Sequence, residues 1–314
     1  MRVVVAIDSF KGSMSSLEAG EAISNGIKKA HKDTEVEIRP LADGGEGTVE
    51  ALSIGMGGRL INVDVTGPVG RKVSAVYGIV DSSKTAIIEM SQAAGITLVS
   101  GDEKNPLYTT TFGVGELIKD AINKGCRHFV VGIGGSATND CGIGMLQALG
   151  YEFLDKEGNQ VGFGASGVRD IVSIRDENVI KELSECYFRV ACDVNNPLCG
   201  ELGCSAIYGP QKGATKEMVA DMDGWLKNYS KIVKEKYPDA DSEYPGTGAA
   251  GGLGYAFFNF TNSKLESGIK IVLDETKLEE YVKDADIVVT GEGRLDHQTV
   301  MGKAPVGVAN IAKK

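Results

Sequence analysis

The sequence lacks the features that mark several large classes of protein. Among its 314 residues, no apolar run approaches the roughly 18 residues that a membrane-spanning helix needs. The N-terminus begins with a strand pattern and has no small-residue cleavage site of a signal peptide. The six cysteines form no Cys-x-x-Cys pair, and in a chain of this length they predict reduced thiols in a cytoplasmic protein. The three histidines are scattered, which excludes a zinc site built from clustered histidines.

Familiar catalytic and nucleotide-binding signatures are missing as well. The chain has no Gly-x-x-x-x-Gly-Lys-Ser/Thr loop and no protein-kinase signature, so the two common nucleotide-binding frameworks are absent. No Gly-x-Ser-x-Gly elbow supports a serine hydrolase. The formal net charge of -10 argues against nucleic acid and an anionic membrane as partners. A bound phosphate would therefore need local loops, and a cation, to hold it.

Glycine, in contrast, is abundant. The 42 glycines follow no collagen period, so they predict many tight loops of the kind that bind ligands. Hydrophobic residues make up 42% of the chain and charged residues 24%, as in an ordinary globular protein. The length suffices for about two domains with a sizeable core.

The most informative stretch is glycine-rich and covers residues 132–144 (GIGGSATNDCGIG). An apolar run precedes it and a helix-compatible run follows it. A strand, a glycine-rich loop and a helix start together predict an anion cradle, because free N–H groups and the positive end of the helix dipole face the loop. Ser136 and Thr138 can add side-chain hydrogen bonds, and Asp140 suits either a helix cap or a metal. A tight turn with an aspartate cap is the structural alternative.

Two βα units open the chain. The buried-strand pattern of residues 2–7 is followed by a helix over 16–30, which places Asp8 and Lys11 beyond the carboxyl end of a strand. Ligands bind at this end of open parallel sheets. Lys11 suits a phosphate or carboxylate and Asp8 suits Mg²⁺ or a hydroxyl, although a solvated loop is the simpler reading.

The second unit repeats this design. A strand over 35–42 leads into Asp43-Gly-Gly-Glu46, and a helix is predicted over 49–55. Two acidic residues around a glycine pair indicate a second polar ligand site at a strand end, with a helix cap by Asp43 as the alternative.

A different pattern begins after this unit. Short β runs over 59–66, 72–80 and 85–90, joined by turns, predict an antiparallel meander and hence a second subdomain. Near the end of the chain, a short strand over 269–273 and a helix over 278–282 return to α/β texture. We therefore expect one α/β domain from residues 1–58 and 284–314, with a mixed α/β domain of residues 59–283 inserted in it.

Further polar residues follow later strands. A strand over 186–194 contains Asp193 near its end, which suits catalysis, metal binding or a loop cap. Lys212 stands in a glycine- and proline-flanked turn. The glycine-dense residues 246–254 suit a nucleotide loop or very close packing. Glu292 and Asp296 follow the last predicted strand, where a carboxylate could accept a proton from a hydroxyl or cap a helix. Together, these strand ends suit phosphoryl transfer with Mg²⁺ better than covalent catalysis, because positioning and charge stabilisation dominate such reactions.

Seven motifs follow one another along the chain, at residues 8–13, 42–48, 132–140, 192–198, 209–214, 248–254 and 290–296. Together they resemble the bacterial type I glycerate kinase family over essentially the whole chain. The resemblance implies phosphorylation of D-glycerate to 2-phosphoglycerate, with ATP and Mg²⁺. It also implies two α/β domains, one flavodoxin-like and one with a mixed sheet, with the active site in the cleft between them.

The motifs yield a mechanistic hypothesis. Asp296 is the first choice for the general base and Asp193 the second, while Lys11 binds the glycerate carboxylate and counts as catalytic. Asp193 and Glu292 are the expected Mg²⁺ ligands. The expected substrate-binding residues are Asp8, Ser9, Lys11, Asp43, Gly44, Gly45 and Glu46; the expected ATP-binding residues are Gly134, Gly135, Ser136, Ala137, Thr138, Lys212, Gly251 and Gly252.

The chain departs from the family pattern at two places. Cys141 stands where relatives usually have glycine, which we expect to alter loop packing only. Relatives also continue beyond the position of Lys314 with a further strand, glycine-rich loop and helix, so we expect that a C-terminal part is missing. This keeps open a non-catalytic sensor of a hydroxy acid or nucleotide, or a truncated pseudo-enzyme. Another transferase acting on an acyl or sugar-acid phosphate is a third alternative, and a homodimer is the expected assembly.

Overall fold

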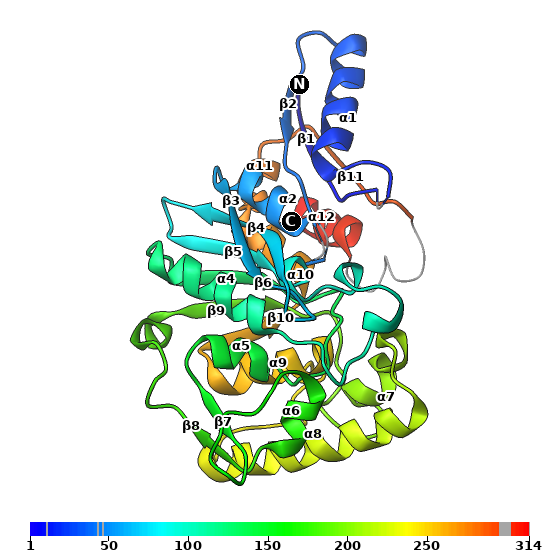
Figure 1. Ribbon diagram of the computed structural model, residues 1–314. Coiled ribbons are helices and arrows are strands. Elements are labelled where there is room, and N and C mark those ends of the chain that lie inside the picture. Colours follow the sequence, from blue (N-terminus) through cyan, green and yellow to red (C-terminus); the bar gives the residue numbers. More distant parts are fainter. Residues whose placement is uncertain (11, 43, 46, 295–302, 314) are drawn as a thin grey trace.

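Two β-sheets organise the computed structural model, which describes residues 1–10, 12–42, 44–45, 47–294 and 303–313. The smaller sheet is parallel, has three strands in the order β11-β1-β2, and projects with helix α1 at the top of Figure 1. Its strands are β1 (Arg2–Ile7), β2 (Glu35–Ile38) and β11 (Ile287–Gly291). Strands from near both ends of the described chain therefore lie in one sheet.

The larger sheet has six strands in the order β10-β9-β6-β5-β4-β3. The predicted meander is confirmed, because β3, β4 and β5 are antiparallel neighbours. From β5 onward the pairing becomes parallel through β6, β9 and β10, so the carboxyl ends of these four strands meet at one edge. The strands are β3 (Arg59–Thr66), β4 (Lys72–Val80), β5 (Thr85–Glu89), β6 (His128–Gly132), β9 (Tyr187–Ala191) and β10 (Ser263–Glu266).

Helices cover both sheets, and a two-stranded antiparallel sheet of β7 (Glu152–Leu154) and β8 (Ser173–Arg175) lies at the far end (Figure 1). No helix in the described ranges is long and apolar enough to cross a membrane. The α-helices are α1 (Ser16–Ala30), α2 (Thr48–Gly55), α3 (Ser91–Ala94), α4 (Phe112–Asn123), α5 (Ile143–Ala148), α6 (Gly164–Asp170), α7 (Cys204–Tyr208), α8 (Lys216–Lys236), α9 (Ala249–Phe260), α10 (Gly268–Glu275), α11 (Leu278–Val282) and α12 (Ala304–Ala312). Short 3₁₀ turns cover Ile96–Leu98, Gly101–Glu103, Lys181–Glu185 and Pro210–Lys212.

Helix α1 shows how a local pattern sets an element's bounds. The Ser15 hydroxyl accepts the backbone N–H of Glu18, and the Glu18 carboxylate accepts the backbone N–H of Ser15 at 2.8 Å, so both groups of a capping box are in place. The apolar stripe of the helix packs on β1, and Val3, Val5 and Ala19 belong to that small core.

One apolar cluster joins the two sheets. It contains Val4 and Ala6 of β1 together with Ile87 of β5 and Val130 of β6, all buried. Helices α10 and α12 add further side chains to it, including Ile271. Burial of apolar surface contributes about 25 cal/mol per Å², so this shared core holds the smaller sheet against the larger one.

The strand predicted over 269–273 is wrong, because these residues belong to helix α10. Four of them are buried, and a short, mostly apolar run does not distinguish a buried strand from a buried helix segment. The missed signal was charge spacing: Glu266, Lys270 and Asp274 are four residues apart, and Lys270 forms ion pairs with both. The strands predicted over 35–42 and 186–194 are also shorter, since they end at Ile38 and Ala191.

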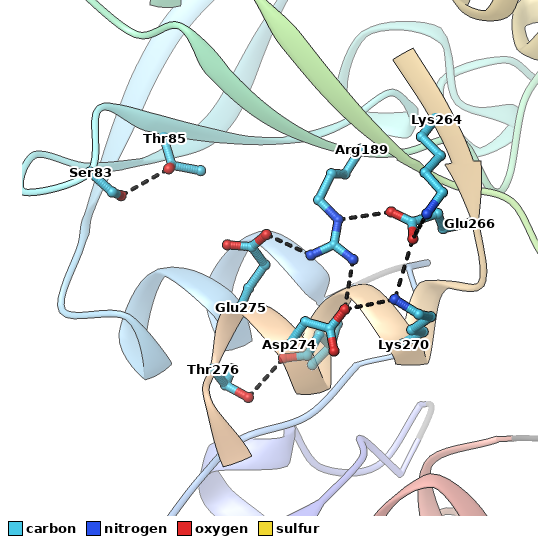
Figure 2. Close-up of polar contacts among 10 residues, drawn as sticks. Ser83, Thr85, Arg189, Lys264, Glu266, Lys270, Asp274, Glu275 and Thr276 are labelled. Atoms are coloured by element: carbon cyan, nitrogen blue, oxygen red, sulfur yellow. Dashed lines mark hydrogen bonds and ion pairs between the residues drawn. The ribbon is translucent and has the colours of Figure 1, made fainter. Parts of the chain in front are cut away.

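Arg189 ties strand β9 to strand β10 and helix α10. Its guanidinium donates to Glu266 at 2.9 Å, to Asp274 at 2.8 Å and to Glu275 at 2.8 Å (Figure 2). Lys264 and Lys270 also contact the buried Glu266 carboxylate, as Figure 2 shows. The network therefore holds the last turn of α10 against strand β9.

Burial by itself would raise the pKa of Glu266, but the bonds from Arg189, Lys264 and Lys270 lower that pKa to about 2. A lowered carboxyl pKa stabilises the fold above the ordinary value, 4.5, and this contribution is lost as pH falls toward 2. We expect Glu266→Gln to lower the melting temperature at neutral pH, with the gap to wild type narrowing in acid. Thermal unfolding followed by circular dichroism at several pH values measures this. Glu185→Gln, in an exposed pair with Arg127, is the control that should change little.

Candidate active site

A cavity of about 800 Å³ lies at the carboxyl ends of β5, β6 and β9. Three segments of the larger sheet line it: Glu89 and Ser91 after β5, Gly134–Ser136 after β6, and Asp193 after β9. The cavity stands at the edge where open α/β sheets bind ligands, because loops from parallel strands converge there. The sequence predicted polar residues at two of these three strand ends.

The smaller sheet contributes Gly44 and Gly45, from the segment between β2 and α2, to the same cavity. Gly44 has φ +88°, and a Cβ there would lie 2.5 Å from the Cβ of Ala191. A Cβ on Gly132 would clash with the carbonyl oxygen of Gly44. Glycine at both positions thus lets backbone from the smaller sheet approach the ends of β6 and β9.

The glycine-rich loop presents backbone to the cavity. Gly134 and Gly135 are exposed there, and the positive φ of Gly135, +74°, suits glycine. The loop is held from outside, since the Gly135 carbonyl accepts the N–H of Ile96 and the Ala137 N–H donates to the Ala94 carbonyl, both at 2.8 Å. Ala137 and Thr138 are buried.

The buried side chain of Lys212 holds this loop in place. Its side chain is only 1% exposed, and its ammonium donates to the Ser136 hydroxyl at 2.7 Å and to the Thr138 carbonyl at 2.6 Å. Burial lowers the pKa of Lys212 to about 8. The lysine also lines the cavity. It is both a brace for the loop and a local cation.

Asp140 is hydrogen-bonded within the fold, although Thr111 and Gly142 are the N-cap residues of α4 and α5. It is fully buried and accepts the N–H of Thr111 at 2.8 Å, the Thr111 hydroxyl at 2.9 Å and the N–H of Gly142 at 3.1 Å. The Thr111 hydroxyl in turn accepts the N–H of Met145. Burial raises the pKa of Asp140. These bonds connect the start of α4 with the start of α5, the helix that follows the glycine-rich loop.

Asp193 is held at the cavity wall by helix α10. One carboxylate oxygen accepts the N–H of Gly268, the first residue of α10, at 3.1 Å. The N-terminus of a helix favours a negative charge, so this contact stabilises the ionised carboxylate in place. The Arg189 network, which fixes α10, therefore also fixes the support of Asp193.

A family model described as "Glycerate kinase family" matches residues 3–314. The chain belongs to the glycerate kinase family.

Relatives in this family match over the full length of the chain. A protein from Haemophilus influenzae named "Glycerate kinase" is 49% identical over 314 residues, which are 100% of this chain and 83% of the relative. "Glycerate 2-kinase" from Escherichia coli is 46% identical over 100% of this chain and 82% of its own. A crystal structure from Salmonella typhimurium LT2, of a protein that also carries the name glycerate kinase, has a TM-score of 0.96 at 47% identity and covers 100% of this chain and 84% of that one.

Gly251 and Gly252 show the close packing that was the alternative to a nucleotide loop. Both have positive φ, and they lie within helix α9 where its backbone departs from helical geometry. A Cβ on Gly251 would clash with the Thr138 carbonyl, and one on Gly252 would lie 2.8 Å from the Cα of Cys141. The neighbours Ala249 and Ala250 line the cavity instead. A phosphate contact at the two glycines stays a prediction.

Cys141, which departs from the glycine expected for glycerate kinases, has a φ of +52°. Only glycine adopts such a backbone without strain, which explains why glycine suits this position. The Cys141 side chain is buried in the large core, and its N–H donates to the Gly251 carbonyl at 2.9 Å.

Other predicted site residues lie at the carboxyl edge of the smaller sheet. The N–H of Asp8 donates to the Gly291 carbonyl at 3.0 Å, and the N–H of Ser9 donates to the Asp8 carboxylate at 2.7 Å. Glu292 follows β11 at the same edge, whereas Asp193 belongs to the larger sheet. In the described part of the chain, no three acidic, cysteine or histidine side chains form a metal cluster. Lys11, Asp43, Glu46 and Asp296 lie outside the described residues.

Glu89 was not predicted as a site residue from the sequence. It ends β5, is 4% exposed and lines the cavity. Its signal was present: an acidic residue at the end of a buried apolar run, the same pattern that identified Asp193. Gln92, Tyr208 and Gln211 also line the cavity and were not singled out.

Proposed function

We propose that this protein transfers the γ-phosphoryl group of ATP to D-glycerate, giving 2-phosphoglycerate and ADP. Membership of the glycerate kinase family supports the reaction, and the name of the Escherichia coli relative supports attack by the 2-hydroxyl. The observation that carries the proposal is that one cavity is lined by Asp193, by Gly44 and Gly45, and by the glycine-rich loop that Lys212 braces.

The loop side of the cavity fits the nucleotide phosphates. The exposed backbone of Gly134 and Gly135 permits close approach of a phosphate, while Ser136 adds a hydroxyl. Lys212 provides a buried positive charge that its hydrogen bonds already hold in place. The side chain therefore does not need to reorganise when charge develops in the transition state. Predicted contacts of ATP with Ala137 and Thr138 would form through the same loop.

The acidic side of the cavity fits a divalent cation. Mg²⁺ in kinases is bound by one or two carboxylates plus phosphate oxygens, and Asp193 supplies a carboxylate at the cavity wall. Mg²⁺ would neutralise charge on the phosphates when bound. Asp193 also suits the alternative role, acceptance of the proton from the glycerate hydroxyl, for which Asp296 remains the first choice. Glu292 remains a proposed second metal ligand.

We infer that the glycerate site lies toward the smaller sheet. Asp8, Ser9, Gly44 and Gly45 belong to the loops of that sheet, and Lys11, Asp43 and Glu46 complete the proposed set. The corresponding division of the chain is a flavodoxin-like domain of residues 1–58 and 284–314 with residues 59–283 inserted. The active site then occupies the cleft between the two. The shared sheet of β1, β2 and β11 supports this division.

An ADP-release assay with ATP, Mg²⁺ and D-glycerate tests the proposed reaction directly. We expect ADP to form at the rate at which glycerate is consumed, and phosphorus NMR to place the phosphate on the 2-hydroxyl. Glycerate binding without ADP release would instead identify a sensor or pseudo-enzyme. A phosphorylated product formed only from another acid would identify a different transferase. L-glycerate serves as the stereochemical control.

A further inference from the structure

Glu89 connects the two halves of the cavity. It stands at the carboxyl end of β5 in the larger sheet, and its side chain accepts the N–H of Val49 at 2.8 Å. Val49 belongs to the first turn of α2, the helix that follows Gly44 and Gly45 from the smaller sheet. A buried carboxylate on one side of the cavity thus bonds the segment that forms the other side.

Among the described residues, Glu89 is the one whose side chain bonds a free N–H group in the first turn of helix α2. Its N-cap residue is Gly47, which has φ +89° and no side chain to bond the free N–H groups of the first turn. The hydroxyl of Thr48 points back to the Gly45 carbonyl, at 2.7 Å. Glu89, from the larger sheet, therefore provides the acceptor for a free N–H group that the N-cap Ser, Thr or Asp provides in other helices. Its negative charge also suits the positive end of the helix dipole.

The same contact determines where the glycine pair lies. Gly44 is wedged against Ala191 at one end of the segment, and Thr48 enters α2 at the other. Since Glu89 bonds the start of α2, it fixes the end of this segment that leads into α2. We propose that Glu89 is a positioning residue that holds the segment of Gly44 and Gly45 at the correct distance from the phosphate-binding loop. This role rests on the proposed function, because it assigns Gly44 and Gly45 to glycerate.

Two conservative variants separate the reach of Glu89 from its charge. Glu89→Asp keeps the charge but is one methylene shorter, so it loses the bond to Val49. Glu89→Gln keeps the reach and an acceptor oxygen without the charge. The free energy lost with a helix cap corresponds to about a fivefold to tenfold change in an equilibrium constant. We therefore expect Glu89→Asp to raise the KM for glycerate by about that factor. The KM for ATP should stay within about twofold in both variants, and Glu89→Gln should stay near wild type.

Glu18→Asp is the matched control. Glu18 also accepts a backbone N–H at 2.8 Å at a helix start, but in α1 and away from the cavity residues. This variant should lower the melting temperature without moving either KM. Isothermal calorimetry of glycerate binding, in the absence of ATP, gives a readout independent of turnover, and Glu89→Asp should weaken binding by the same factor as it raises KM.

Three results would overturn the role. Glu89→Gln more harmful than Glu89→Asp would show that the charge itself contacts substrate or metal. Equal rises in both KM values would show a general loss of structure. A lowered melting temperature with unchanged glycerate binding would show a cap without a positioning effect. A wild-type protein that releases no ADP would overturn the proposed function instead, so the two failures are distinguishable.

Discussion

Lys212→Met is expected to lower kcat by about 10²–10³-fold, the usual cost of removing one preorganised charge or donor from a phosphoryl or acyl transfer site. The ammonium braces the glycine-rich loop through Ser136 and Thr138 and places a cation at the cavity wall. Methionine keeps much of the volume but none of these interactions. Steady-state kinetics with saturating ATP and glycerate measure the loss. Lys227→Met removes an exposed lysine of α8, paired with Asp223, and should leave kcat unchanged.

The pH dependence provides a second test of Lys212. Because burial lowers its pKa to about 8, the charged form declines above that pH, and we expect wild-type kcat to fall there. Stability should move the opposite way: between about pH 8 and the ordinary lysine value, 10.5, the unfolded chain binds more protons at this residue than the folded chain does. The stability of wild type relative to Lys212→Met should therefore rise across this range. A relative stability that falls instead would contradict a buried lysine with a lowered pKa.

Local patterns in the sequence predicted the elements whose formation depends on near neighbours. The apolar run of β1, the capping box at Ser15 and Glu18, and the alternating strands of the meander all specify structure within a few residues. The glycine-rich loop after β6 was equally visible, because a strand, a loop and a helix start follow directly in the chain. Helix α10 was misread, since its buried face is too short to show a helical period.

Contacts between distant segments were not predictable in this way. Gly44 lies close to Gly132 and Ala191 because the two sheets share a core. The residues next to each of these three positions in the sequence do not indicate that the three segments are in contact. The bond from Glu89 to Val49 depends on the same approach. Gly251 was visible as part of a glycine-dense stretch, but its partner, the Thr138 carbonyl, was not. The sequence therefore predicted which residue types gather at strand ends, and tertiary packing decided which of them face the cavity.

Asp193→Asn is expected to lower kcat by about 10²–10⁴-fold while the KM for glycerate changes little. Asparagine keeps an oxygen for the N–H of Gly268, so the side chain should stay at the N-terminus of α10. It lacks the charge needed to accept a proton or to hold a divalent cation, and both proposed roles of Asp193 require that charge. Single-turnover and steady-state measurements of ADP formation separate a chemical defect from a binding defect. Asp81→Asn, at an exposed pair with Arg59, is the control and should be neutral.

The dependence on Mg²⁺ distinguishes the two roles of Asp193. If its carboxylate holds the cation, Asp193→Asn should raise the Mg²⁺ concentration needed for half-maximal rate, and excess Mg²⁺ should restore part of kcat. If the carboxylate accepts the proton, the Mg²⁺ requirement should stay at the wild-type value, and the acidic limb of the pH–rate profile should disappear. Asp296→Asn, measured in parallel, tests the first choice for the base. Near-wild-type rates in both variants would contradict the assignment of either aspartate to the chemical step, and the proton would then have to leave through another group at the cavity.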